Sequence, residues 1–284
     1  MPELPETETI ARDLHALVRG AVVRGVAVPR PDVLREVTAD GLAQTLTGLA
    51  IGRVWRRAKL VVLALDAPQA PPGGVAPWQL VVQPRFTGGL LVQDGPVPEG
   101  ELRYVAVTLQ LTDGRALHYR DVRRLGTVAL MAPARFAAYS GALGPEPLDP
   151  AMDTAAFSGC VRGSRRAIKV VLMDQRRLAG VGNIYANEAL WHAGIDPSRE
   201  AEGLTLAECD ALREALQRVL GASVAARGTS FRDYRDARGQ RGGYVDALAA
   251  YGRGGLPCRR CAHPLASTHA LDGRATVFCP ACQR

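Results

Sequence analysis

The chain opens Met1-Pro2-Glu3-Leu4-Pro5-Glu6, and the residues that follow make this stretch the first turn of a helix. Apolar residues then recur at the spacing of one helix face, at Ile10, Leu14, Leu17 and Val18, and Gly20 supplies a stop. The carboxylates of Glu3 and Glu6 fall in or near the first turn, where the helix dipole favours anions. We expect the apolar stripe to anchor this end in a core and the other polar side chains to face solvent: Thr7, Thr9, Arg12 and Asp13.

Pro2 gives this helix end a candidate chemistry. Pro2 is small enough that Met1 is normally removed before it, which would leave a prolyl secondary amine at the start of the chain. Secondary amines condense with aldehydes to iminium ions, a route to covalent catalysis on a sugar, and Glu3 and Glu6 lie beside the amine to move protons. A retained Met1 would cap the amine and abolish this chemistry. Judged on these six residues alone, a plain helix start is the simpler interpretation.

The composition indicates a globular protein with a polyanionic partner. The 284 residues suffice for two domains or more, and 47% of them are apolar. A formal net charge of +7 points toward nucleic acid, although only weakly by itself. The first residues are acidic and proline-punctuated, unlike a signal peptide, and no apolar run approaches the ~18 residues that span a membrane. We therefore expect a bacterial-type cytosolic protein.

Between Ala21 and Met131 the sequence predicts strands, which are rich in β-branched residues and separated by Gly, Pro and Asp. Thr112-Asp113-Gly114 is a hairpin-type turn, and Ala67–Pro77 is a Pro/Gly-rich loop. Because no long helices separate the strands, an antiparallel sandwich is favoured over a doubly wound sheet. The expected strands are Ala21–Val28, Ile51–Asp66, Gln79–Asp94, Leu102–Leu111, Arg115–Arg120 and Thr127–Met131.

After Pro133 the periodicity becomes helical. Two of the expected helices are joined by the tight turn Gly180-Val181-Gly182-Asn183, and the lone cysteines Cys160 and Cys209 fall in helical apolar patterns, as core residues do. From Arg227 to Gly243 the chain becomes Gly- and Arg-rich and loses periodicity, which predicts a mobile loop. The expected helices are Ala134–Leu143, Thr154–Arg162, Arg166–Leu178, Ile184–Ala193 and Leu206–Ala226.

The cysteine spacing near the C-terminus is typical of a zinc ribbon. Cys258-x-x-Cys261 and Cys279-x-x-Cys282 form two knuckles that can close a tetrahedral site. Four thiolates leave no open position for water, so we expect one structural Zn²⁺ rather than a catalytic one. A module this small buries little core, so metal binding should supply most of its folding energy. His263 and His269 are spare ligands that four thiolates make unnecessary.

The N-terminal stretch and the cysteine knuckles together resemble one family, the formamidopyrimidine-DNA glycosylases of the helix-two-turn-helix superfamily. The resemblance runs almost end to end. Besides the Pro2–Glu6 start and the ribbon, it rests on these motifs: Arg56-Arg57-Ala58-Lys59, which leads a strand, Asp121-Val122-Arg123-Arg124-Leu125-Gly126, Leu143-Gly144-Pro145-Glu146-Pro147-Leu148, Ala167-Ile168-Lys169, and Gly180-Val181-Gly182-Asn183-Ile184-Tyr185-Ala186-Asn187-Glu188.

The resemblance implies an α+β multidomain fold in three parts. Residues 1–132 would form an N-terminal helix plus antiparallel β-sandwich, residues 133–250 a helix-two-turn-helix DNA-binding domain with a lesion-recognition loop, and residues 251–284 a β-hairpin zinc ribbon. DNA would lie in a basic cleft between the halves. The implied activity is that of a bifunctional glycosylase and abasic-site lyase of base excision repair, acting on duplex DNA that contains oxidised purines or abasic sites. We expect a cytoplasmic, nucleoid-associated monomer with no membrane partner.

By the same resemblance, Pro2 would attack the deoxyribose C1′, displace the damaged base and form an iminium. Glu3 would protonate the sugar oxygen or shuttle protons during ring opening, while Glu6 would organise the site. The iminium acidifies the adjacent sugar carbon, so β- then δ-elimination would cut the strand on both sides. Lys59 and Arg274 complete the implied catalytic set by holding phosphates beside the lesion.

The resemblance also implies a set of DNA contacts. Asn183 would bind the same phosphates as Lys59 and Arg274, as helix N-termini do, and such contacts position DNA without reading its sequence. Gln83 stands where the enterobacterial pattern has a phosphate-contacting His, and it can still donate a hydrogen bond. The lesion would be read by backbone N–H groups of the loop Arg227-Gly228-Thr229-Ser230.

A flipped-out nucleotide leaves a gap in the duplex, which the family fills with a Met, an Arg and a Phe. The aligned positions in this sequence are Phe86, Arg124 and Leu125. Arg124 is retained and would pair with the orphaned cytosine. The other two are exchanged, which keeps an apolar wedge but changes its shape.

Three alternatives remain beside this interpretation. The sister enzyme endonuclease VIII uses the same proline chemistry on oxidised pyrimidines, but typically has Gly where this chain has Leu4. A non-catalytic zinc-ribbon protein that binds damaged DNA would not need Pro2, Glu3, Glu6 and Lys59 together. A zinc-ribbon nuclease would need an Asp/Glu/His cluster for a catalytic metal, and the sequence offers none.

Overall fold

The structure is a computed structural model that describes residues 2–68, 76–95 and 99–284. It divides into two compact units, Met1–Gly141 with Arg227–Gly243, and Ala142–Ala226 with Tyr244–Arg284. This division differs from the predicted boundaries, because the segment Arg227–Gly243 belongs to the first unit rather than to the helical one. Most of the predicted loop Ala67–Pro77 lies outside the described residues.

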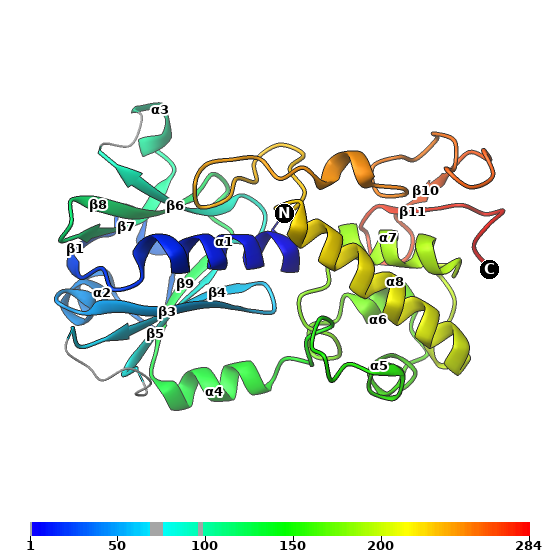
Figure 1. Ribbon diagram of the computed structural model, residues 1–284, viewed down its shortest axis with the longest axis horizontal. Coiled ribbons are helices and arrows are strands. Elements are labelled where there is room, and N and C mark those ends of the chain that lie inside the picture. Colours follow the sequence, from blue (N-terminus) through cyan, green and yellow to red (C-terminus); the bar gives the residue numbers. More distant parts are fainter. Residues whose placement is uncertain (1, 69–75, 96–98) are drawn as a thin grey trace. The chain divides into compact units, whose positions relative to one another are not determined.

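The first unit is a sandwich of two sheets, with strand orders β1-β7-β8-β6 and β2-β9-β5-β4-β3 (Figure 1). Described neighbours pair antiparallel except for β2 and β9, which run parallel. The predicted α+β class and sandwich are therefore confirmed. The strands are β1 (Val23–Ala27), β2 (Leu34–Arg35), β3 (Ala50–Arg57), β4 (Leu60–Asp66), β5 (Trp78–Gln83), β6 (Gly88–Asp94), β7 (Val105–Leu111), β8 (Arg115–Asp121) and β9 (Thr127–Met131).

Two of the expected strands each prove to be two strands. The stretch predicted as Ile51–Asp66 is the β3–β4 hairpin, which turns at Ala58 and Lys59, where Ala58 adopts φ 52°. The stretch predicted as Gln79–Asp94 passes from β5 of one sheet to β6 of the other. Two helices of this unit were not predicted, α2 (Ala39–Leu46) and α3 (Glu99–Leu102), whereas α4 (Pro133–Gly141) lies where a helix was predicted.

The helix α1 (Leu4–Val18) runs along the sandwich, in contact with β3 and β4 of one sheet and β6 of the other (Figure 1). Its apolar stripe is buried, as predicted. The prediction that Thr7, Thr9 and Asp13 face solvent was wrong, because the helix is covered on more than one side. The two threonine hydroxyls are satisfied inside the helix, since each donates to the carbonyl four residues earlier, at 2.7 Å and 2.8 Å.

The second unit is helical. Its longest helix, α8 (Leu206–Ala225), packs against α7 (Asn183–Ala193) and α5 (Thr154–Val161). The helix predicted over Arg166–Leu178 is much shorter, α6 (Ile168–Leu172), because the chain then turns at Asp174, whose carboxylate accepts the N–H of Arg176 at 3.1 Å. No helix in the described ranges is both long and apolar enough to cross a membrane.

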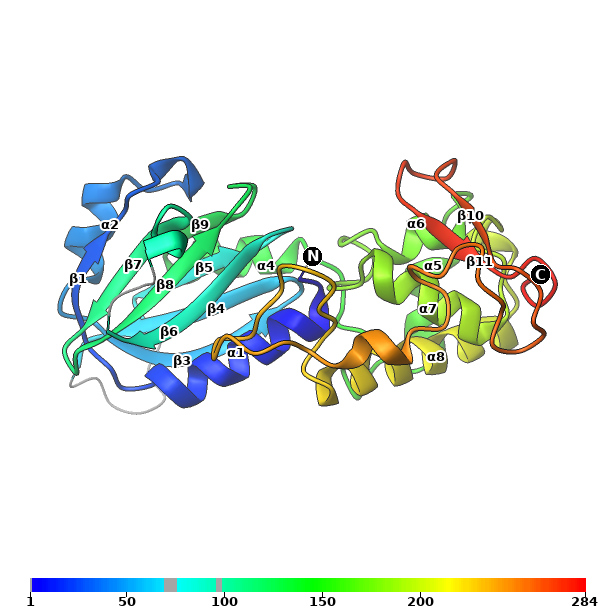
Figure 2. The same cartoon turned by 90° about the horizontal axis from the view of Figure 1, so that it is seen from above.

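The C-terminal hairpin of β10 (Ala266–Thr268) and β11 (Thr276–Phe278) completes this unit, and β11 contacts α7 (Figure 2). Trp191 of α7 belongs to the same buried cluster as Cys258, Leu265 and Val277. The hairpin therefore packs against α7 through apolar contacts. Short 3-10 turns lie at Pro31–Val33, Ala201–Gly203 and Tyr244–Ala247.

Candidate functional site

The N-terminal end of α1 carries the three residues for which covalent chemistry was predicted: Pro2 and Glu3 directly precede the helix, and Glu6 lies in its first turn. Pro2 is buried, and the side chains of Glu3 and Glu6 are 1% and 0% exposed. The N–H of Glu3 donates to Glu6 Oε2 at 2.8 Å, and the N–H of Thr229 donates to Glu6 Oε1 at 2.8 Å. Glu6 thus joins the helix end to a segment 223 residues further along the chain. Met1 lies outside the described residues.

The segment that Glu6 meets begins at Arg227, and the structure packs it against the sandwich. The Arg227 guanidinium bridges the carboxylates of Asp13 and Asp236, which raises the pKa of Arg227, with the Asp236 hydrogen bond as the main cause. Tyr234 and Ala237 are buried in the core of the first unit. The loop that was predicted to read the lesion, Arg227-Gly228-Thr229-Ser230, therefore packs against α1. The loss of helical periodicity in the sequence did not indicate this contact.

Gly228 shows why this loop needs a glycine. It adopts φ +87°, and a Cβ there would lie 3.0 Å from Glu6 Cγ and 3.0 Å from the Tyr234 ring. The Tyr234 hydroxyl donates to the Arg227 carbonyl at 3.1 Å. The loop backbone thus approaches the first turn of α1 more closely than any side chain would allow.

Lys59 lies in the β3–β4 turn, directly before β4 and not within a strand. The turn is held by arginines on its own hairpin: Arg56 Nη1 donates to the Ala58 carbonyl at 3.1 Å, and Arg57 Nε donates to Ser140 Oγ at 3.0 Å. Gln83 ends β5 and is half-buried.

The three predicted void-filling residues are exposed on two loops of the first unit. Phe86 lies between β5 and β6 and is 44% exposed, while Leu125, between β8 and β9, is 40% exposed. Arg124 adopts φ 52° and its guanidinium lies 3.3 Å from the Asp32 carboxylate. Arg123 stacks over the Phe86 ring at 5.0 Å, so the two loops meet.

Asp121 holds these two loops in place through hydrogen bonds, a role that was not predicted from the sequence. Its carboxylate accepts hydrogen bonds from Thr87 Oγ1 at 2.5 Å, Gly126 N at 2.8 Å and Tyr119 Oη at 3.1 Å. A Cβ at Gly126 would lie 2.0 Å from the Tyr119 hydroxyl. Hydrogen bonding and packing therefore explain why the motif begins with Asp121 and ends with Gly126. The same contacts do not explain the exposed Arg124 and Leu125 between them.

In the second unit, Asn183 and Arg274 flank one carbonyl. Asn183 is the first residue of α7, and its Nδ2 donates to the Ala275 carbonyl at 3.0 Å. Arg274 precedes that carbonyl in the chain, is exposed, and pairs with Asp272 at 3.1 Å. The structure thus brings the helix start and the ribbon residue into one neighbourhood.

Two residues of the quoted motifs hold this neighbourhood together and were not assigned a function. Lys169 is fully buried, and its Nζ donates to Thr276 Oγ1 at 2.7 Å and to the Ala275 carbonyl at 3.2 Å. Asn187 Oδ1 accepts the N–H of Val277 at 2.7 Å. A lysine between apolar helix residues was the signal in the sequence, because an unpaired buried ammonium is costly.

The cysteine knuckles form a metal-binding cluster. The Sγ atoms of Cys258, Cys261, Cys279 and Cys282 all lie within 4.8 Å of one another, and the Cys261–Cys279 separation is 3.5 Å. Four sulfurs about 2.3 Å from a tetrahedral Zn²⁺ would be about 3.8 Å apart, so the donor set fits this ion. Among the described residues, neither His263 nor His269 joins the cluster.

Family models match almost the whole chain. The N-terminal domain model of formamidopyrimidine-DNA glycosylase covers residues 1–128, and its H2TH domain model covers residues 143–235. The chain belongs to the formamidopyrimidine-DNA glycosylase family. A third model, the zinc finger found in FPG and IleRS, covers residues 255–284 and so includes the cysteine cluster, which makes this part of the family member a zinc-binding module.

Relatives agree with this assignment. The chain is 42% identical over 267 residues to the formamidopyrimidine-DNA glycosylase of Moorella thermoacetica, covering 93% of each chain. Among solved structures, it resembles the MutM (FPG) protein of Thermus thermophilus at 37% identity, TM-score 0.84, covering 99% of this chain and 98% of that one. It also resembles a mutant Lactococcus lactis FPG in complex with a Fapy-dG containing DNA, at 29% identity, TM-score 0.88 and full coverage of both chains. The family resemblance inferred from the motifs is confirmed.

Proposed function

We propose that this chain is a bifunctional DNA glycosylase and abasic-site lyase that removes 8-oxoguanine and formamidopyrimidines from duplex DNA. The observation that carries the proposal is the N-terminal end of α1, where Pro2, Glu3 and Glu6 are all buried in a member of this family. The complex of the Lactococcus lactis relative with Fapy-dG containing DNA supports the choice of substrate. Such an enzyme would act as a monomer in the cytoplasm, on DNA of the nucleoid.

Pro2 is the proposed nucleophile, once Met1 has been removed. Its amine would form a bond to the deoxyribose C1′ as the bond from C1′ to the base breaks, and ring opening would then leave an iminium. Glu3 would give a proton to the sugar oxygen, since its carboxyl adjoins Pro2 in the chain. Loss of a proton from the carbon beside the iminium would start the β- and then the δ-elimination.

Glu6 has a positioning role in this proposal. Both of its carboxylate oxygens accept backbone N–H groups, one from Glu3 and one from Thr229. A carboxylate held in this way fixes Glu3 at the helix start and sets the lesion loop against the same helix end. The proposed catalytic and base-reading elements therefore share one anchor.

Phosphate contacts are assigned to Lys59, Gln83, Asn183 and Arg274. Lys59 lies in a turn that Arg56 and Arg57 stiffen, so its ammonium is presented from a fixed backbone. Asn183 begins a helix, where backbone N–H groups favour anions, and Arg274 is exposed. Such contacts fix the DNA and make binding salt-dependent.

Base extrusion is assigned to Phe86, Arg124 and Leu125. Two of these side chains are apolar and exposed, as a wedge for a duplex must be in the free protein. Arg124 would pair with the base opposite the lesion. Backbone N–H groups of Arg227, Gly228, Thr229 and Ser230 would read the extruded base.

One structural Zn²⁺ is assigned to Cys258, Cys261, Cys279 and Cys282. When bound, it would cross-link the two knuckles and carry no step of the reaction, because four thiolates fill its coordination shell. It would hold the hairpin that presents Arg274.

The proposal is tested by covalent trapping. The purified protein, with removal of Met1 verified by mass spectrometry, is mixed with a duplex carrying 8-oxoguanine opposite cytosine, and borohydride is added. We expect a reduced adduct on Pro2, which peptide mapping locates. No adduct despite tight binding would leave a damaged-DNA binder and contradict the catalytic proposal.

Two matched duplexes complete the design. An otherwise identical duplex with guanine at the lesion should give no adduct, which excludes non-specific reduction. A duplex with an oxidised pyrimidine should be trapped more slowly than the 8-oxoguanine duplex. Faster trapping of the pyrimidine would assign the chain to the endonuclease VIII type of activity.

A further inference from the structure

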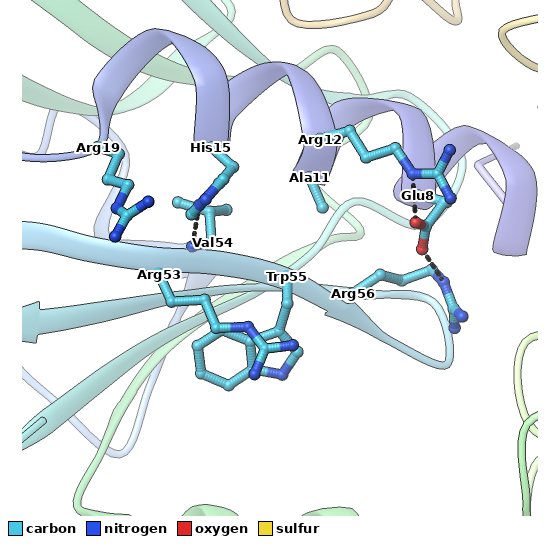
Figure 3. Close-up of a pocket in the computed structure, with 9 residues that line it drawn as sticks. All are labelled: Glu8, Ala11, Arg12, His15, Arg19, Arg53, Val54, Trp55 and Arg56. Carbon is cyan, nitrogen blue, oxygen red and sulfur yellow. Dashed lines mark hydrogen bonds and ion pairs between the residues drawn. The ribbon is translucent and has the colours of Figure 1, made fainter. Parts of the chain in front are cut away.

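A second concave site lies on the first unit, between α1 and β3. The cavity has a volume of about 490 Å³ and is lined by α1 residues from Glu8 to Arg19 and β3 residues from Arg53 to Arg56 (Figure 3). Its α1 lining begins after Glu6 and runs toward the C-terminal end of the helix. Small-molecule sites usually measure about 300–1,000 Å³, so this cavity has the size of a ligand site.

The lining is strongly cationic. It includes Arg12, Arg19, Arg53 and Arg56, against one carboxylate among its described residues, that of Glu8. That carboxylate already pairs with Arg12 at 2.6 Å and with Arg56 at 2.8 Å, and the Arg56 side chain is only 8% exposed (Figure 3). Arg56 is therefore a built part of the wall and not a loose surface charge.

Two of these arginines carry charge that the described protein does not neutralise. Within residues 2–68, 76–95 and 99–284, the guanidinium groups of Arg19 and Arg53 make no hydrogen bond or ion pair. Both residues are exposed. Guanidinium groups only donate hydrogen bonds, and their fork matches the paired oxygens of phosphate.

An aromatic surface stands beside the charges. The guanidinium of Arg53 lies 5.4 Å from the centre of the Trp55 ring (Figure 3). Phe136 packs edge-on against the same ring, with the two ring centres 5.9 Å apart. His15 is fixed by the Val54 N–H, which donates to its Nδ1 at 3.1 Å. The Arg53–Trp55 pair in the same pocket as the Arg19 guanidinium suits a ligand that has both a flat ring and a phosphate.

We propose that this pocket binds a nucleoside phosphate, either free or as a unit of a nucleic-acid strand. Its phosphate would lie between Arg19 and Arg53, and its base would stack on the Arg53–Trp55 pair. Phosphate alone would leave most of the cavity empty and would not use the ring. This site is separate from the residues assigned to lesion repair, so the proposal does not rest on the Pro2 chemistry.

The test is isothermal titration calorimetry of the full chain with dGMP, at low salt. We expect saturable binding with one site per chain. The double variant Arg19→Gln with Arg53→Gln should weaken it about 100-fold, because each charge-assisted contact is worth roughly tenfold. The control double variant Arg24→Gln with Arg30→Gln removes two exposed arginines outside the pocket and should change affinity less than about twofold.

Three further ligands and one further variant decide the interpretation. Inorganic phosphate and deoxyguanosine should each bind more weakly than dGMP; equal affinity for phosphate would overturn the nucleoside part of the proposal. A short single-stranded oligonucleotide that binds more tightly than dGMP through Arg19 and Arg53 would support it and identify a strand as the source. Lys59→Ala should leave dGMP binding intact. Loss of binding in that variant, no saturable binding, or no effect of the Arg19 and Arg53 changes would overturn the proposal.

Discussion

Two glutamates of this molecule have similar surroundings, because both are buried and hydrogen-bonded, but they are assigned different roles. Glu6 and Glu188 are both 0% exposed, and both accept backbone N–H groups from a segment far along the chain. Glu6 accepts from Glu3 and Thr229, whereas Glu188 accepts from Ala249, Ala250 and Tyr251 at 2.7–2.9 Å.

The difference between them lies in their neighbours. Glu6 adjoins Pro2 and Glu3, which can react and move protons. Glu188 meets a run of backbone just before the zinc-binding module, and its burial raises its pKa in spite of three donated N–H groups. A buried, hydrogen-bonded carboxylate is therefore no sign of catalysis in itself. Substitutions at the two places separate the proposed catalytic end of α1 from the structural junction on α7.

Removal of zinc should have the largest effect, and that effect should fall on the ribbon that presents Arg274 and not on α1. Metal binding contributes roughly 10–16 kcal/mol in small zinc-finger peptides, far more than the hairpin's apolar contacts can replace. After chelation, we expect backbone amides between Cys258 and Cys282 to lose protection in hydrogen exchange, while amides of α1 keep theirs. Equal protection of the ribbon amides with and without metal would show that packing against Trp191 is enough to keep the ribbon folded.

Glu3→Gln should have the largest effect on the catalytic side. General acid–base catalysis typically contributes about 10²–10⁴-fold, so single-turnover release of 8-oxoguanine should slow by that range while the thermal midpoint changes little. Glu8→Gln is the matched control, because it removes a carboxylate from the same helix that is 20% exposed and pairs only with arginines in the described contacts. A similar slowing in both variants would point to helix charge instead of proton transfer.

The sequence predicted those parts of the fold and site that depend on local spacing. β9 was predicted at its observed bounds, Thr127–Met131, and the four cysteines met as their knuckle spacing required. The β3–β4 turn was missed because Arg56-Arg57-Ala58-Lys59 carries no Gly or Pro to mark it. Local pattern gives no warning of such a turn.

A second group of features was missed because each depends on a distant partner. Asp13 was predicted to face solvent, yet it is 6% exposed because Arg227, 214 residues later, covers it. Asp121 and Lys169 were quoted in motifs without a role, since the partner of Asp121 lies on another loop and that of Lys169 on the ribbon. The candidate residues came from the resemblance to a family. The hydrogen bonds and packing contacts that hold those residues in place came from the structure.

The two buried glutamates can be compared directly by making the variants Glu188→Gln and Glu6→Gln. Losing hydrogen bonds to a buried carboxylate should cost each variant about 3 kcal/mol in the free energy of unfolding, measured with urea. Only Glu6→Gln should also slow single-turnover base release, because only Glu6 orders Glu3 and the lesion loop. Unchanged base release by folded Glu6→Gln would remove the positioning role.

Glu208→Gln should give the smallest effect, and one with a distinctive pH dependence. Glu208 closes the N-terminus of α8, where the Arg199 ion pair, and after it the Thr205 N–H, lower its pKa from 4.5 to about 2. Because the folded-state pKa lies below the ordinary value, the stabilisation is fully present above about pH 4.5 and is lost as pH falls through about 2. The group is partly exposed, so solvent screening limits the contribution to about 1 kcal/mol.

The pH series therefore distinguishes Glu208 from Glu188 by the sign of its slope. The stability difference between wild type and Glu208→Gln should shrink as pH falls from neutral toward 2, followed by urea unfolding at each pH. For Glu188 the folded-state pKa is raised, so its protonation-linked contribution is present below 4.5 and is lost as pH rises through the folded value. A Glu208→Gln difference that stays constant across this range would mean that the cap acts through its hydrogen bonds alone and that the charge on Glu208 adds nothing.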